Sequence, residues 1–138
     1  MDAATFRLFP AAMATAIVSS LGLRTDPGTG WLLAGAESES GAGVAGVRLE
    51  LEPASSAGPF YLNERGVFER GLAATSINSR DGALFGLLPP GVYRLTAKLG
   101  PRLCQRSITI PIEEGRLTLV PDFLCPQPEP LRGAQARP

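Results

Sequence analysis

Residues 1–23 carry hydrophobic positions at helical spacing. Apolar side chains recur every three or four positions on what would be one helix face, at Phe6, Phe9, Met13, Ile17 and Leu21. Gly22 and Leu23, which come next, are typical of a helix end, where glycine adopts a left-handed conformation and an apolar residue folds back. The spacing therefore predicts an amphipathic helix in the N-terminal region.

The same region has an alternative interpretation as a secretion signal. Residues 8–23 are mostly apolar and small, as the core of such a signal would be. A signal also carries net positive charge before its core, whereas here Asp2 is acidic and Arg7 is the only base that precedes it. We expect the folded helix, with the signal as the alternative.

From residue 31 onward the hydrophobic period changes to two. Residues 47–52 alternate strictly, with valine and leucine on one side and arginine and glutamate on the other. Similar short runs follow between turns rich in Gly, Pro, Asn and Asp. The predicted strands are residues 31–37, 47–52, 60–62, 73–77, 83–88, 92–99, 103–112 and 116–120. Strands of this length and spacing predict an antiparallel β-sandwich, which would bury Val47, Leu49, Leu51, Phe85, Tyr93, Leu95 and Ile110 between its sheets.

This pattern divides the chain into three parts. Residues 1–30 are expected to form the N-terminal amphipathic helix and a loop, and residues 31–125 the β-sandwich domain. Residues 126–138 contain four prolines and no apolar period, which predicts an extended tail. The strand pairing within residues 53–72 is left open, because this stretch has no clear period.

Two cysteines, Cys104 and Cys125, can be placed by register. A turn at residues 113–116 would centre a hairpin in which Ile112 faces Leu117, with the apolar pairs on one side. The same register brings Cys104 opposite Cys125. This placement favours a disulfide, and a disulfide favours an oxidising compartment. Two buried free thiols are the alternative.

Composition narrows the functional classes. The chain has 138 residues, which suits one domain, and with 44% hydrophobic residues it can form a packed core. Thirteen basic residues balance thirteen acidic ones, so charge gives no reason to expect a nucleic-acid partner. Histidine is absent, which excludes Ser–His, Cys–His and histidine-ligated metal chemistry within this chain. No apolar stretch reaches the roughly 18 residues of a spanning helix, so no transmembrane segment is expected.

Two stretches between residues 33 and 99 carry a family motif. The first stretch contains Gly35, Gly41 and the sequence Val-Ala-Gly-Val-Arg-Leu at residues 44–49. The second contains Thr75, Asp81, Gly82, Phe85 and the sequence Leu-Pro-Pro-Gly-Val-Tyr at residues 88–93. With these residues the chain resembles the carboxypeptidase regulatory-like domain. The resemblance implies a transthyretin-like, seven-stranded antiparallel Greek-key sandwich. It implies no catalysis, since such modules accompany enzymes, receptors or envelope proteins as accessory domains.

Candidate catalytic and metal-binding groups are few. Glu50 and Glu52 share a strand face, but this face is the one expected to be solvated. Asp81 lacks the Asp-x-Asp spacing of a calcium loop and is expected to be a turn residue. We therefore assign no catalytic, cofactor-binding or metal-binding residue, and we expect a protein that is not an enzyme.

Recognition is the remaining functional class. Trp31, Phe60 and Tyr61 are the candidate ligand contacts, although core packing is the favoured interpretation of all three. We expect a non-catalytic accessory or interaction module of the cell envelope or extracellular space, with a protein or a cell-surface polysaccharide as partner. The alternative is a carbohydrate-binding module that uses surface aromatics. That alternative requires Trp31 and Tyr61 to be exposed together on one face.

Overall fold

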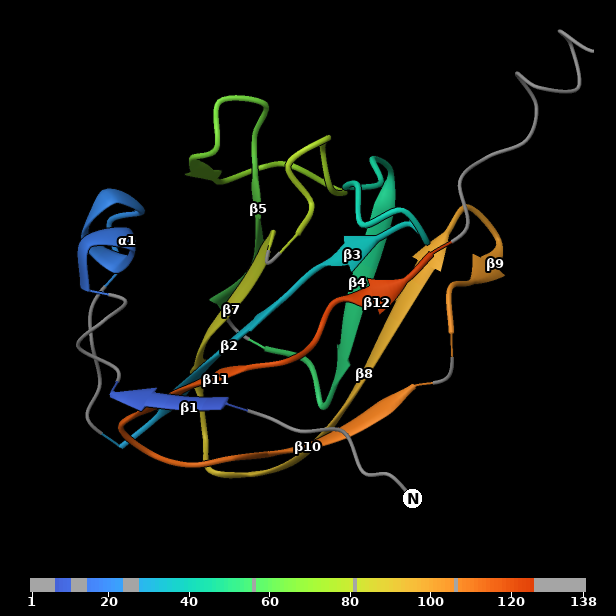
Figure 1. The fold of residues 1–138 in the computed structure, drawn as a ribbon. Helices are drawn as coiled ribbons and strands as arrows, with labels where there is room; N and C mark the ends of the chain where they lie inside the picture. Colours follow the sequence, from blue (N-terminus) through green and yellow to red (C-terminus); the bar gives the residue numbers. More distant parts are fainter. Residues whose placement is uncertain are drawn as a thin grey trace, which may run out of the picture.

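The computed structural model describes residues 7–10, 15–23, 28–55, 57–80, 82–105 and 107–125. These residues form a mainly β, sandwich-like fold (Figure 1). In chain order the elements are β1 (Arg7–Pro10), α1 (Thr15–Ser20), β2 (Gly30–Ala34), β3 (Ala36–Glu37), β4 (Val47–Glu52), β5 (Ala57–Leu62), β6 (Phe68–Glu69), β7 (Ala83–Leu88), β8 (Gly91–Leu99), β9 (Arg102–Leu103), β10 (Ile108–Ile112), β11 (Arg116–Leu119) and β12 (Phe123–Leu124).

The described strands form two main sheets and a short ribbon. The larger sheet has the order β1-β11-β2-β7-β5-β6, and the smaller has the order β10-β8-β4, with β9 added to β8. Strands β3 and β12 pair with each other and continue the lines of β2 and β11 (Figure 1). The two sheets enclose one hydrophobic core to which both contribute.

The core is lined by buried side chains of both sheets, and β4 shows the pattern most clearly. Strands β4 and β7 have the predicted bounds, and the side chains of β4 are alternately buried and exposed. The predicted core residues are all buried, namely Val47, Leu49, Leu51, Phe85, Tyr93, Leu95 and Ile110. The prediction of a mainly β fold with these residues inside is therefore confirmed.

The corner between β7 and β8 is built by the Leu-Pro-Pro-Gly-Val-Tyr sequence. Tyr93 buries its ring, and its hydroxyl donates a hydrogen bond of 2.6 Å to the carbonyl of Pro89. The bond connects the first residues of β8 to the corner that precedes them. Burial raises the pKa of the Tyr93 phenol above its ordinary value. Tyr93 thus has the structural role that the sequence predicts.

The N-terminal region differs from the prediction of a single helix. Arg7–Pro10 form strand β1, which adds antiparallel to β11, and the helix α1 spans only Thr15–Ser20. Spacings of three and four suggested one helical face, but the strand gains ladder hydrogen bonds from the edge of β11 that a helix would not. After α1, Gly22 has a φ of 72° and Leu23 packs back against the larger sheet.

The predicted hairpin between β10 and β11 is wrong, although the disulfide that it suggested is present. β10 pairs with β8 in the smaller sheet, whereas β11 pairs with β1 and β2 in the larger one. The turn after β10 therefore crosses from one sheet to the other. Ile110 and Ile112 of β10 face the inner core, whereas Leu117 of β11 faces the outer cluster of the larger sheet. Because the larger sheet is apolar on both faces, the apolar pattern of these two strands fits a hairpin and such a crossing equally well. The pattern alone could not separate the two.

Three further expectations are corrected. Residues 73–77 form no strand, and the predicted strand 103–112 is divided into β9 and β10. The pairing is not antiparallel throughout, because β11 with β2 and β12 with β3 run parallel. Parallel neighbours are possible here because a long stretch of chain separates the two members of each pair. The predicted tail of residues 126–138 lies outside the described residues.

Candidate functional site

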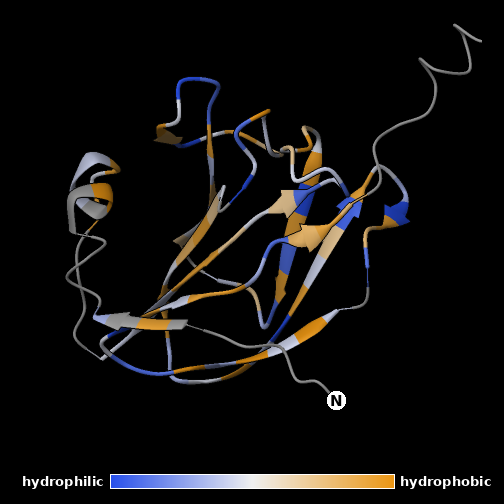
Figure 2. Ribbon diagram, viewed as in Figure 1, coloured by the Kyte–Doolittle hydropathy of each residue, from blue (hydrophilic) through white to orange (hydrophobic). Residues whose placement is uncertain are grey.

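A cleft of about 620 Å³ opens at the end of the sandwich where β5 and β6 meet. Its walls are the turn at residues 63–65, Glu69 of β6, the segment of residues 72–77, and Ala45. In Figure 2 the turn between β5 and β6 is hydrophilic. Loops at one end of a β-sandwich are common binding sites, because the scaffold holds them without constraining their sequence.

The wall formed by the β5–β6 turn is held by Asn63. Its side-chain oxygen accepts hydrogen bonds from the backbone amides of Arg65 (2.8 Å) and Val67 (3.1 Å). Its side-chain nitrogen donates to Glu69 at 2.8 Å. An asparagine that bonds the backbone two residues ahead is a common turn device. One side chain therefore fixes both the turn and a carboxylate at the rim of the cleft.

The opposite wall is the irregular segment that follows β6. Asn78 donates to the carbonyls of Asn63 (3.0 Å) and Glu64 (2.8 Å), and Ser76 donates to the carbonyl of Leu62 at 2.9 Å. These bonds join the segment to the β5–β6 hairpin. Ser and Asn side chains that bond backbone groups give the chain an alternative to a ladder. This is the physical reason why the predicted strand at residues 73–77 is absent.

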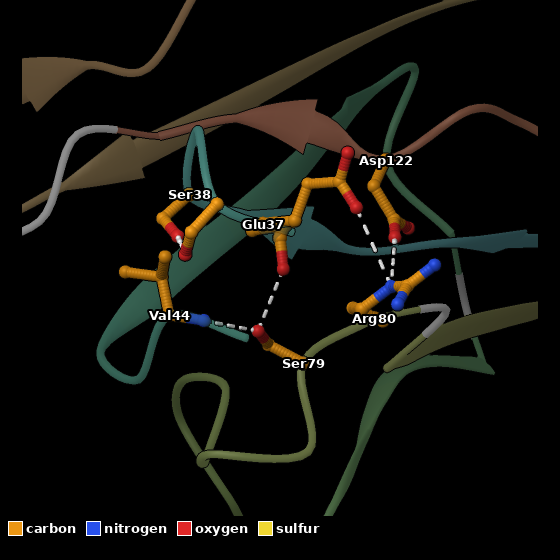
Figure 3. Close-up of polar contacts among 8 residues, drawn as sticks. Glu37, Ser38, Val44, Ser79, Arg80 and Asp122 are labelled. Carbon is orange, nitrogen blue, oxygen red and sulfur yellow. Dashed lines mark hydrogen bonds and ion pairs between the residues drawn. The ribbon is translucent and has the colours of Figure 1, made fainter. Parts of the chain in front are cut away.

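Thr75 and Ser79 fasten the same segment to the other side of the molecule. Thr75 donates to the carbonyl of Val44 at 2.7 Å and accepts from the amide of Val47 at 2.9 Å. Ser79 donates to the carbonyl of Ala36 at 2.7 Å and accepts from the amide of Val44 (Figure 3). Both side chains are buried. The amide of Val47 belongs to the free edge of β4, so Thr75 also caps that edge.

Two ion pairs of Arg80 complete this attachment. The guanidinium of Arg80 lies 3.4 Å from Glu37 of β3 and 3.7 Å from Asp122, which precedes β12 (Figure 3). The neighbouring Asp81, which was predicted to be a turn residue, lies outside the described residues. Sequence reasoning identified Thr75 through the family motif but missed Asn63, Asn78 and Ser79. The Asn-x-x-Gly spacing of the turn after Leu62 was a signal for the first of these.

The cleft offers a mixed surface. Leu72, Ala74 and Ile77 give it apolar walls, and the side chain of Ile77 is 65% exposed. Glu64 and Arg65 add a carboxylate and a guanidinium at the rim. Apolar walls with a few fixed polar groups are the usual composition of a preformed ligand site.

The three predicted aromatic contacts are all buried, and they do not share a face. Trp31 is 2% exposed, Tyr61 2% and Phe60 7%. Trp31 and Phe60 lie on the outer face of the larger sheet, in a cluster with residues after α1. Tyr61 points the other way, into the core, where its hydroxyl accepts a bond of 3.0 Å from the amide of Leu49. The exposed aromatic platform that the carbohydrate-binding alternative requires is therefore not present.

Burial dominates the electrostatics of Tyr61. It raises the pKa of the phenol above its ordinary value, against the lowering effects of the Leu49 amide and of Arg48. The phenol therefore has a structural role, because its hydroxyl connects the larger sheet to the free edge of β4. Along this edge, Tyr61 bonds the amide of Leu49 and Thr75 bonds the amide of Val47.

The carboxylates considered for catalysis lie on the outer face of the smaller sheet. Glu50 is 3.3 Å from Lys98, and Glu52 pairs with Arg94 across the strands. These exposed ion pairs are ordinary cross-strand contacts. Within the part of the chain that the structure describes, no group of three or more Cys, Asp or Glu side chains is arranged to hold a metal ion.

The disulfide joins the two halves of the sandwich. Cys104 follows β9, where its amide bonds Ala97 of β8, and Cys125 follows β12, where its amide bonds Glu37 of β3. The bond therefore links the smaller sheet to the β3–β12 ribbon, with a Cα–Cα distance of 4.4 Å. The predicted pair is confirmed, and no free thiol remains.

Comparison with known proteins identifies no relative: no protein-family model matches the chain, and no curated protein or solved structure matches it significantly. Among the described residues no helix has the length and apolarity that a membrane crossing requires.

Proposed function

We propose that this protein is a non-catalytic interaction module, built on a transthyretin-like sandwich and acting in the cell envelope or outside the cell. The observation that carries the proposal is the preformed cleft between the β5–β6 turn and residues 72–77. Asn63, Ser76 and Asn78 hold both walls through bonds to backbone groups. A site held in this way loses little conformational entropy on binding.

The motif residues support the transthyretin-like type. Thr75 bonds the strand that carries the Gly-Val-Arg-Leu sequence, and Tyr93 closes the Leu-Pro-Pro-Gly corner. Thr75 and Tyr93 thus have structural roles that a related sandwich would need. The Cys104–Cys125 bond supports an oxidising compartment, because disulfides persist there and are rare in the cytosol of most cells.

A protein segment is the partner that the cleft favours. Its lining contains apolar side chains and charges of both signs, whereas none of the described residues that line it is aromatic. Sugar rings are commonly held by stacking on aromatic faces, and this cleft offers no such face. An extended segment with an aliphatic side chain would bury it against Ile77 and Leu72 and would bond the polar rim.

Site-specific photo-cross-linking tests this proposal. A photoreactive residue at Ile77 is compared with one at Val92, which is equally exposed but lies on the outer face of the smaller sheet. We expect a discrete protein adduct from position 77 alone, in cells that produce the chain. The purified partner should then bind Ile77→Lys at least tenfold more weakly than the wild type, and Val92→Lys unchanged. Equal labelling from both positions, or binding on a glycan array instead, would contradict the proposal.

A further inference from the structure

The outer face of the larger sheet carries an apolar surface that a very small element covers. Strands β2, β5, β7 and β11 send large side chains to this face, namely Trp31, Phe60, Leu84 and Leu117. All four are at most 8% exposed. Among the described residues, Ile17 of α1 packs over this face together with Leu21 and Leu23, which follow it. Figure 1 shows α1 at one side of the molecule, outside the two sheets.

Two backbone features shape this face for apolar contact. Gly86 of β7 lies directly beneath the Trp31 ring, where an added Cβ would come within 2.1 Å of an indole carbon. Leu87 has a φ of 52°, in the left-handed region that leucine rarely adopts. The register shifts along the β2–β7 pairing, and Leu87 joins the outer cluster rather than the core. Strained residues of this kind concentrate at functional surfaces.

Arg70 bonds the end of this cover. The guanidinium of Arg70 donates two hydrogen bonds to the carbonyl of Leu21, at 3.0 and 2.7 Å, directly after the last helical residue. The same group lies 5.6 Å from the centre of the Phe60 ring. The carbonyl end of a helix carries partial negative charge, so a cation there is complementary. The face therefore recognises aliphatic side chains and a helix end together.

The helix itself contributes little to its own stability. α1 has six residues, and isolated helices below roughly 12–15 residues are marginal in water. Within the described residues, the contacts of Ile17, Leu21 and Leu23 and the Arg70 bonds support it. Leu33, Phe68 and Leu87 border the cluster and remain only partly buried. The apolar surface thus extends beyond what the short helix can cover.

We infer that the Trp31–Phe60 face is a docking site for an amphipathic helix of a partner protein, and that α1 is its displaceable occupant. The partner helix carries aliphatic residues four positions apart near its C-terminal end, as Ile17 and Leu21 do, and offers a terminal carbonyl to Arg70. A longer helix of this pattern displaces α1 because it also covers Leu33, Phe68 and Leu87. This site is separate from the cleft and does not depend on it.

Trp31 is the only tryptophan in the chain, so its fluorescence reports directly on this face. The probe is a synthetic amphipathic helix of about twenty residues that ends in Leu-Gly-Leu, and its control carries aspartate at two aliphatic positions. In the full-length Leu21→Asp chain we expect red-shifted emission and stronger quenching by iodide. The probe should reverse both changes saturably, and the control should not. The wild type should bind the probe at least tenfold more weakly than Leu21→Asp, because α1 competes.

Arg70→Gln in the Leu21→Asp background should weaken the probe about tenfold, through loss of the bonds to the helix end. Ile17→Ser is the milder variant should Leu21→Asp fail to fold. A shielded Trp31 in both variants, or emission that the probe does not restore, would overturn the inference. So would a dimer by light scattering that covers the face with a second copy. Loss of the β-sheet circular-dichroism signal in both variants would also overturn it, because the helix would then be part of the core.

Discussion

The two faces of the larger sheet are both apolar, but the chain covers them by different means. The inner face packs against a second sheet, and a disulfide ties that sheet to the β3–β12 ribbon. Over the outer face, the described part of the chain places a six-residue helix and the residues that follow it, and Arg70 bonds the end of this segment. Equal burial of side chains therefore does not mean equal stability, because the cost of uncovering a face depends on what covers it.

The largest effect should come from the inner core. Leu95 is fully buried between the sheets, so Leu95→Ala should lower the free energy of unfolding by about 2–5 kcal/mol. Urea denaturation followed by far-UV circular dichroism measures it. The transition should stay cooperative, because the inner core unfolds as one unit. A loss below about 1 kcal/mol would show that this core is not the stabilising one.

Removal of the disulfide should weaken the same region. The bond closes a loop with a sequence separation of 21, for which the chain-entropy model gives about 3 kcal/mol. Reduction should lower the melting temperature while the folded chain keeps its shielded Trp31, since the outer face does not contact the bond. Intact mass after alkylation without reductant verifies the starting state. Two alkylated thiols at that stage would refute the bond and the compartment proposed from it.

The two buried tyrosines should make the stability of the inner core depend on pH. Burial raises the pKa values of Tyr61 and Tyr93, so the folded chain keeps both protons at a pH where the unfolded chain loses them. Their contribution is complete below the ordinary value of 10.0 and is lost as the pH rises above it. Tyr61→Phe should cost about 1–3 kcal/mol at neutral pH, because the Leu49 amide loses its partner. It should also make the free energy of unfolding, measured by urea denaturation, fall less steeply at alkaline pH. An unchanged slope would contradict this assignment.

The smallest global effect should come from the outer face. Leu21 is almost as buried as the core residues, yet Leu21→Ala should lower the global free energy of unfolding by about 1 kcal/mol or less. This loss of unfolding free energy cannot exceed the free energy that is needed to detach the helix from the sheet. Iodide quenching of Trp31 should nevertheless increase clearly. A loss as large as that of Leu95→Ala would mean that both faces belong to one unit.

The sequence predicted the elements whose pattern is local. Strands β4 and β7 and the Tyr93 corner follow from alternation and turn residues that sit side by side in the chain. The partners of β10 and β11 were missed, because alternation records which positions of a strand are apolar but not which sheet holds the strand or which face of that sheet they lie on. The N-terminal strand was missed because its ladder partner, β11, lies more than a hundred residues away.

The cleft was the hardest feature to predict. Its walls depend on Asn63, Ser76 and Asn78, which bond backbone groups of distant residues. Such residues resemble ordinary turn residues in a sequence. The aromatic residues are a second example of a placement that the sequence could not predict. Trp31 and Tyr61 face opposite sides of the larger sheet, and only the folded structure shows which side each residue faces.

Native-state hydrogen exchange in low urea tests the difference between the two faces most directly. The amide of Leu21 bonds Ile17 in the helix, and the amide of Val120 bonds Leu33 between β11 and β2. We predict that Leu21 exchanges through a small opening that urea barely changes, whereas Val120 exchanges only with global unfolding and its full urea dependence. If both amides exchange with the same free energy and the same urea dependence, the helix is part of the core and the account is wrong.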